Sequence, residues 1–339
     1  MKAFTRLQIF SLRCCVFLCL ALLSLDARAA DTNALTLVKK ILLPNVTGRI
    51  DHFAQDVKGQ RLFVAATDNN TVEVIDLAAG KYAGTIGNCS TPKGLAFIPT
   101  GNRLVIVNSG SGTVKILDSI SFKTLASFPN LPDADNVRYD AKTDLIYVGY
   151  GGGALAIIRA TGGELVATIA LPAHPESFEV EKNGNRIFVN LPGAQKVAVV
   201  NGAMQTVVET WWVRDSIDNF PMALDETNHR LFSGCRKPSR IVVLDTLSGN
   251  DVVTVDVSKD VDDLFYDASR KQIYASCGEG FIDVITQTDA DTYELRQRIP
   301  TTKDARTSWF SPERSELYLA VPGSMISGSA EIRVFKCHP

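Results

Sequence analysis

The sequence predicts an all-β fold made of seven copies of one four-stranded antiparallel unit. An apolar anchor recurs about every 42 residues, and each copy alternates short strands rich in Val, Ile, Phe and Tyr with turns of Gly, Asn and Asp. No helical periodicity follows residue 30. Four-stranded units at this period are the signature of a β-propeller, in which the units form blades around a central axis.

The repeat is anchored by two adjacent residues at the start of the second strand of each unit. In the first copy the apolar second member is Leu62, and it recurs at intervals of 42, 42, 41, 44, 42 and 44 residues. The seven pairs are Arg61-Leu62, Arg103-Leu104, Leu145-Ile146, Arg186-Ile187, Arg230-Leu231, Gln272-Ile273 and Glu316-Leu317. This regularity predicts a single seven-bladed domain over residues 30–339, although the length of 339 residues alone suggests about two domains.

The first and last copies show how a blade is built and how the ring closes. In the first copy, strands are expected at 53–55, 61–66, 71–76 and 81–86. The last copy offers only three, at 307–310, 316–320 and 330–335, whereas residues 35–43 have the pattern of an outer strand. We therefore expect this N-terminal strand to complete the last blade, which leaves no open sheet edge at the junction.

The first 29 residues predict a secretory signal peptide. Lys2, Arg6 and Arg13 make a basic start, residues 14–25 form a largely apolar run of twelve, and small residues occupy positions −3 and −1 of a cut after Ala29. A membrane-spanning helix needs about twenty apolar residues, so this run is too short to be an anchor. We expect an exported chain, periplasmic or secreted, with no membrane span and as a monomer.

Charge and cysteine content limit the function classes further. The chain has 35 basic and 37 acidic side chains, a net charge of −2, and no strongly basic stretch, which disfavours nucleic acid as a partner. Four cysteines follow the signal: Cys89, Cys235, Cys277 and Cys337. An oxidising compartment permits disulfides, and the sequence leaves open whether these residues are bridged or free.

The seven copies differ most at the start of the inner strand. Five residues before the turn that ends this strand, the copies carry Asp51, Lys93, Asp135, Glu176, Phe220, Asp262 and Arg306. One residue later they carry His52, Gly94, Asn136, Ser177, Pro221, Asp263 and Thr307. Two residues before the first set they carry Arg49, Thr91, Asp133, His174, Asp218, Asp260 and Asp304.

Inner strands run along the central channel of a propeller, so their starts should surround one of its openings. We name the candidate ligand-binding set the polar mouth: Arg49, Asp51, His52, Lys93, Asp135, Asn136, Glu176, Phe220, Asp262, Asp263 and Arg306. By contrast, the positions one and three residues before the turn are apolar in six of seven copies. This pattern predicts a buried lower half of the strand and a polar start.

Two short segments carry a family resemblance. Residues 62–66 (LFVAA) followed by 70–76 (NTVEVID), and residues 104–108 (LVIVN) with the following strand to Asp118, resemble the YVTN-repeat propellers, the YncE-like exported proteins. The resemblance covers the chain from about residue 35 to its end and implies the propeller fold and export. It implies little about activity, because such propellers serve many roles. Cys235 and Cys277 depart from the pattern, since they replace the Asn that ends the second strand.

The residue types of the polar mouth support three hypotheses. In the first, the mouth binds a small anionic ligand or a protein partner, and Arg49, Lys93 and Arg306 supply the cations. In the second, the charged ring is purely structural and holds the blades in register. The first predicts Arg49 or Arg306 facing an open cavity, whereas the structural hypothesis predicts each of them paired with an acid and closed off from solvent.

The third hypothesis is a metal-dependent, lactonase-like hydrolase acting on lactones or esters. Its candidate ligands are Asp51, His52, Asn136, Glu176 and Asp262. Oxygen ligands suit a hard divalent cation such as calcium, and the imidazole would also admit a transition metal. Such an ion would polarise a carbonyl and lower the pKa of a bound water.

Overall fold

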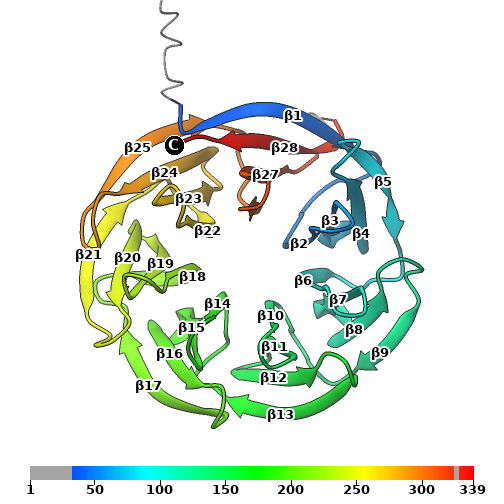
Figure 1. The fold of residues 1–339 in the computed structure, drawn as a ribbon, viewed down its shortest axis with the longest axis horizontal. Coiled ribbons are helices and arrows are strands. Elements are labelled where there is room, and N and C mark those ends of the chain that lie inside the picture. The colour runs from blue at the N-terminus through cyan, green and yellow to red at the C-terminus, as the bar shows by residue number, and fades with distance from the viewer. Residues whose placement is uncertain (1–32, 324–327) are drawn as a thin grey trace, which may run out of the picture. The chain divides into compact units, whose positions relative to one another are not determined.

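The computed structural model describes residues 33–323 and 328–339. Within these ranges, 28 strands form seven separate four-stranded sheets arranged in a ring (Figure 1). The predicted all-β, seven-bladed propeller is therefore confirmed. The expected signal peptide, residues 1–29, lies outside the described residues. In the part of the chain that is described, no helix is long and apolar enough to cross a membrane.

Each blade runs from an inner strand at the centre to an outer strand at the rim (Figure 1). The inner strands are β2 (Phe53–Asp56), β6 (Pro92–Ile98), β10 (Val137–Asp140), β14 (Phe178–Val180), β18 (Ile217–Asp225), β22 (Val261–Asp267) and β26 (Ser308–Ser311). The second strands are β3 (Arg61–Ala66), β7 (Arg103–Asn108), β11 (Leu145–Tyr150), β15 (Arg186–Leu191), β19 (Arg230–Lys237), β23 (Gln272–Cys277) and β27 (Glu316–Val321).

The outer half of each blade completes the sheet. The third strands are β4 (Thr71–Asp76), β8 (Thr113–Asp118), β12 (Ala154–Arg159), β16 (Lys196–Asn201), β20 (Ser239–Asp245), β24 (Phe281–Gln287) and β28 (Ala330–Cys337). The outer strands are β5 (Lys81–Ile86), β9 (Thr124–Phe128), β13 (Glu164–Ala170), β17 (Thr206–Trp212), β21 (Asp251–Asp256), β25 (Tyr293–Pro300) and β1 (Leu35–Leu43). We number the blades 1 to 7 by their inner strands, so that β2 belongs to blade 1 and β26 to blade 7.

The ring closes as the sequence predicts. β1 pairs antiparallel with β28, with Leu35 opposite Cys337 and Leu43 opposite Ala330, and the last sheet has the order β1-β28-β27-β26. The two described ends of the chain are thus held in one blade (Figure 1). This pairing covers the edge that β28 would otherwise expose.

The hydrophobic core lies between neighbouring blades. Leu62 and Val64 on β3 of blade 1 share one buried cluster with Tyr318 and Ala320 on β27 of blade 7. Strand side chains alternate between the two faces of a sheet, and in a propeller each face packs on a neighbouring blade. This packing explains why the middle strands read as nearly continuous apolar runs. The four described cysteines are free thiols, which resolves the alternative that the sequence left open.

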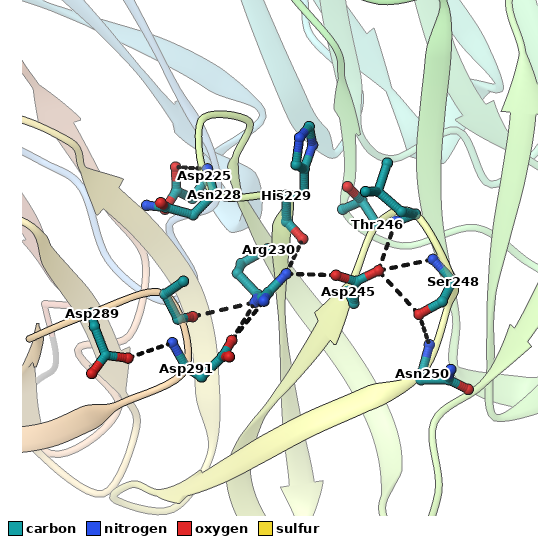
Figure 2. A network of polar contacts seen from close by, with 12 residues as sticks. Asp225, Asn228, His229, Arg230, Asp245, Thr246, Ser248, Asn250, Asp289 and Asp291 are labelled. Atoms are coloured by element: carbon teal, nitrogen blue, oxygen red, sulfur yellow. Dashed lines mark hydrogen bonds and ion pairs between the residues drawn. The ribbon is translucent and has the colours of Figure 1, made fainter.

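The arginine of the repeat anchor ties one blade to the next. Arg61 Nη2 of blade 1 donates to Ser119 Oγ of blade 2 at 2.9 Å, and Arg61 Nη1 donates to the Ser119 carbonyl. Arg230 of blade 5 donates through Nε to the Ala290 carbonyl at 3.2 Å and to Asp291 Oδ1 at 2.9 Å, both in blade 6 (Figure 2). The anchor arginine therefore recurs because it joins adjacent blades at their turns.

Candidate functional site

The backbone before the inner strands explains part of the acidic pattern at the polar mouth. Two residues before Asp51 and its counterparts, five of the seven copies have a backbone φ between 48° and 65°. These residues are Thr91, Asp133, Asp218, Asp260 and Asp304. Asp tolerates this left-handed conformation better than most residues with a side chain. These aspartates thus have a backbone role in addition to their charge, which the sequence analysis did not recognise.

Four charged residues of blades 1 to 3 meet around His52. Its Nε2 lies 3.4 Å from Asp51 Oδ1 and 3.8 Å from Asp135 Oδ1. Arg49 pairs with Asp51 at 2.7 Å, and Lys93 Nζ pairs with Asp135 Oδ2 at 2.7 Å. Because Asp51 and Asp135 are almost fully buried, each carboxylate depends on these cations for its charge balance.

Gly94 makes the close approach between blades 2 and 3 possible. A side chain at this position would place its Cβ 2.1 Å from the backbone carbonyl oxygen of Asp135. No residue other than glycine fits there without a shift of one blade. The Pro-x-Gly sequence at 92–94 therefore has a packing reason.

A second group of charges lies between blades 5, 6 and 7. Arg306 Nη1 lies 2.5 Å from Asp260 Oδ2, and Arg306 Nε lies 3.1 Å from Asp262 Oδ2. Arg236, at the end of β19, pairs with the same two carboxylates and stacks over the Phe220 ring at 4.1 Å from its centroid. Arg236 thus belongs to this site, although its sequence context, a basic turn, gave no sign of it.

The remaining residues of the polar mouth make single contacts. Asp263 Oδ2 accepts the Ser308 backbone N–H at 2.7 Å, and Asn136 Oδ1 accepts a long hydrogen bond of 3.5 Å from Arg138 Nη1. Glu176 Oε1 lies 3.9 Å from His174 Nε2. Glu176 and Asp263, which form no close ion pair with a lysine or arginine of the described residues, are therefore less well compensated than Asp51, Asp135 and Asp262.

Burial and mutual repulsion shift the protonation of this cluster. Burial would lower the pKa of His52, but the carboxylates of Asp51 and Asp135 outweigh it and raise the pKa to about 9. Burial, reinforced by neighbouring acids, raises the pKa of Glu176 to about 7 and that of Asp263 to about 7. The pKa of Asp135 lies well below its usual range because His52 and Lys93 together outweigh its burial.

A cavity of about 650 Å³ runs along the axis of the ring, below the polar mouth. Its lining extends from His52 and Asp263 to Thr227, Ala268 and Pro312, in the turns at the opposite ends of the inner strands. Of the polar-mouth residues, only His52 and Asp263 contribute to this lining. The structure therefore gathers the predicted residues into an ion-paired layer at one end of the channel. The cavity below this layer is lined mainly by other residues.

The two expectations for the arginines are each met in part. Arg49 and Arg306 are both paired with acids, as a structural role predicts. Their side chains nevertheless remain 46% and 31% exposed, so neither is closed off from solvent.

Three of the five proposed metal ligands already contact an arginine side chain of the protein. Asp51 and Asp262 contact arginine, and Asn136 contacts Arg138. Among residues 33–323 and 328–339, no three His, Cys, Asp or Glu side chains form a group that could hold a metal ion. The described geometry thus supplies no ligand set for the divalent cation of the hydrolase hypothesis.

Comparison with known proteins supports the fold. No protein-family model matches the chain, and no curated protein sequence matches it. Many solved structures are similar, among them a chain from the crystal structure of a mitotic checkpoint complex, with a TM-score of 0.77. The match covers 99% of both chains at 14% sequence identity. At this identity the likeness shows the seven-bladed architecture alone.

Proposed function

We propose that the chain is an exported binding propeller whose polar mouth docks a protein partner through a basic segment. The observation that carries the proposal is the excess of carboxylates at the mouth. Counted with Asp260 and Arg236, which pair with residues of the mouth, there are six acids and five cations. The acids are Asp51, Asp135, Glu176, Asp260, Asp262 and Asp263, and the cations are Arg49, His52, Lys93, Arg236 and Arg306. Among the described residues, the only basic side chain within 4 Å of the Glu176 carboxylate is His174, at 3.9 Å. A lysine or arginine from a partner would supply the charge that Glu176 lacks.

The same geometry disfavours a small anion as the ligand. An anion at Arg306 would compete with Asp260 and Asp262, which already contact both sides of the guanidinium. It would also approach a cluster that is rich in negative charge, which costs electrostatic energy. A cationic group instead reduces the repulsion among the acids.

Binding of a hexalysine peptide to the purified mature chain tests this proposal. Because the pKa of Glu176 is raised to about 7, a bound cation should displace its proton, and affinity should increase from pH 6 to pH 8. Glu176→Gln should weaken binding about tenfold. The matched control is Glu164→Gln, at the exposed start of outer strand β13, which should bind as the wild type does.

Other outcomes of the same measurement reject the proposal. Tighter binding of hexaglutamate than of hexalysine would favour an anionic ligand at Arg49, Lys93 and Arg306. Equal effects of the Glu176 and Glu164 variants would show attraction by net charge without a site. Melting the chain with and without EDTA tests the hydrolase hypothesis, because a bound ion stabilises the folded state.

A structural role of the ring is the second candidate. Lys93 with Asp135 and Arg306 with Asp262 each connect two blades, as a scaffold would require. In that case no peptide binds, and variants at the mouth change only the free energy of unfolding. Export is tested separately: N-terminal sequencing of the secreted or periplasmic protein should begin at Ala30.

A further inference from the structure

The axial cavity lies below the polar mouth, shares only His52 and Asp263 with it, and is large enough to enclose a small molecule. Its volume of about 650 Å³ lies within the range of about 300–1,000 Å³ that is typical of ligand sites. The space exists because three inner strands carry alanine two residues before their turn: Ala54, Ala96 and Ala223, all of which line the cavity. The four other blades carry large side chains at this level.

Two of these large side chains form an aromatic wall. Phe265 of blade 6 and Trp309 of blade 7 lie edge to face, with ring centroids 6.3 Å apart and an interplanar angle of 70°. Both line the cavity and both are only half-buried. Such a pair offers a flat ligand a stacking surface, since aromatic rings prefer offset or edge-to-face neighbours.

The two remaining large side chains at this level of the channel form a polar wall. Arg138 of blade 3 and Glu179 of blade 4 lie 3.9 Å apart, with side chains 34% and 29% exposed. Arg138 Nη2 also donates to Ser177 Oγ at 3.2 Å. Strands β10 and β14, which carry this pair, lie across the ring from blade 7 (Figure 1). At this level of the channel, the cavity therefore has an aromatic side and a side with one cation and one carboxylate.

A buried amide adds a third polar feature beside the aromatic wall. Gln55 accepts the Trp309 indole N–H through Oε1 at 3.0 Å. Its Nε2 is buried and has no hydrogen-bond partner in the described structure. Gln55 is 9% exposed and lines the cavity. A buried amide donor without a protein partner is uncommon, and this one can donate to an acceptor on a molecule in the cavity.

We propose that the channel binds one neutral, planar heteroaromatic molecule of two or three fused rings, stacked on the Trp309 ring and edge to face with Phe265. The polar wall carries no net charge, so it favours a ring edge with adjacent acceptor and donor, for Arg138 and Glu179 respectively, over a simple carboxylate or amine. Nucleobase-, pterin- and isoalloxazine-type rings have such edges. The aromatic and polar walls contain no residue of the polar mouth, so peptide binding at the mouth is not required for this site.

Calorimetry and tryptophan fluorescence with lumichrome, a tricyclic ring of this class, test the proposal. We expect one molecule per chain and quenching of the part of the emission that Trp309→Phe removes. Ala96→Leu, which fills the half-buried channel position, should weaken binding about tenfold or more. The matched control is Ala79→Leu, at an exposed turn, which should bind as the wild type does.

A second variant keeps the test decisive if Ala96→Leu does not fold. Arg138→Gln removes the cation of the polar wall and should also weaken lumichrome binding about tenfold, while hexalysine binding stays unchanged. Absence of lumichrome binding at millimolar concentration overturns the proposal. So does equal or tighter binding of benzoate or benzylamine, or lumichrome affinity that neither variant changes.

Discussion

Lys93 Nζ lies 2.7 Å from Asp135 Oδ2, and this ion pair joins the start of β6 in blade 2 to the segment that leads into β10 of blade 3. Both side chains are largely buried, and Gly94 lets the two backbones approach beside them. The polar mouth thus combines two properties: it connects blades, and it leaves carboxylates such as Glu176 without a close cation. The first serves the fold, and the second is available to a partner.

Lys93→Met should destabilise the fold by about 2–4 kcal/mol, because Asp135 would keep its buried charge with only His52 beside it. Urea unfolding at pH 7 measures the effect. Lys58→Met, at an exposed turn position, is the control and should change the free energy of unfolding by less than about 0.5 kcal/mol. If the free energy of unfolding falls equally in the two variants, the ion pair with Asp135 contributes no more to stability than an exposed lysine does.

The sequence predicted the blades well because the repeat is a local pattern. The spacing of Leu62 and its six counterparts gave seven sheets, and the incomplete last copy gave the pairing of β1 with β28. Each of these inferences needed only the order of apolar and turn residues along the chain. Neither depended on which side chains meet across blades.

The partners at the site could not be predicted in the same way. Arg236 contacts Asp262, which lies 26 residues later in the sequence. This contact depends on how blade 5 packs on blade 6. The channel wall was also missed, although a signal exists: the position two before the turn mixes alanine with Arg138, Glu179, Phe265 and Trp309. A position that is neither uniformly apolar nor uniformly polar indicates a surface that the seven blades do not share equally.

The stability of the chain should fall as pH rises from 7 to 9. The pKa of His52 is raised to about 9 in the folded state against about 6.5 in an unfolded chain. Its contribution is complete below about pH 6.5 and is lost as pH rises through 9, a loss of roughly 1–3 kcal/mol. Glu176 and Asp263, with pKa values of about 7, act in the same direction but mainly below pH 7.

Urea unfolding of the wild type and of His52→Gln at pH 7, 8 and 9 isolates this contribution. The variant is expected to be less stable at pH 7 and to lose less stability toward pH 9 than the wild type. Parallel slopes for the two proteins would contradict the assignment of a charged His52 between Asp51 and Asp135.

Removal of β1 should open the ring. Ile41 and Leu43 are buried in the core between blades 7 and 1, and a chain that begins at Pro44 loses them together with every hydrogen bond to β28. The loss of the two aliphatic side chains alone costs about 3–6 kcal/mol. We expect the melting temperature to fall by about 10 °C or more.

The control for this deletion is a chain that begins at Asn33, which keeps β1 and should melt as the mature protein does. A synthetic peptide covering residues 33–43 should restore part of the lost melting temperature by adding a strand to the edge of β28. Unchanged melting of the shorter chain would show that the ring holds without this strand.

The anchor arginine of blade 5 should stabilise the ring through its fork of donors. Arg230 contacts Asp245 through Nη1 at 2.6 Å and Asp291 through Nη2 at 2.6 Å (Figure 2). Arg230→Lys keeps the charge but cannot hold both acids and the Ala290 carbonyl at once, so a loss of about 1–2 kcal/mol is expected. Arg159→Lys, on an exposed strand end, is the matched control and should be nearly neutral.

A double-mutant cycle separates the contact with Asp291 from the rest of this network. Asp291 is 60% exposed whereas Arg230 is 12% exposed, so the coupling between Arg230→Lys and Asp291→Asn should be modest, about 0.5–1 kcal/mol. The larger part of the loss should persist when Asp291 is already Asn, because Asp245 and the Ala290 carbonyl still lack their donor. If the coupling energy with Asp291 equals the whole destabilisation caused by Arg230→Lys, then the exposed ion pair, and not the contact with the Ala290 carbonyl, joins blade 5 to blade 6.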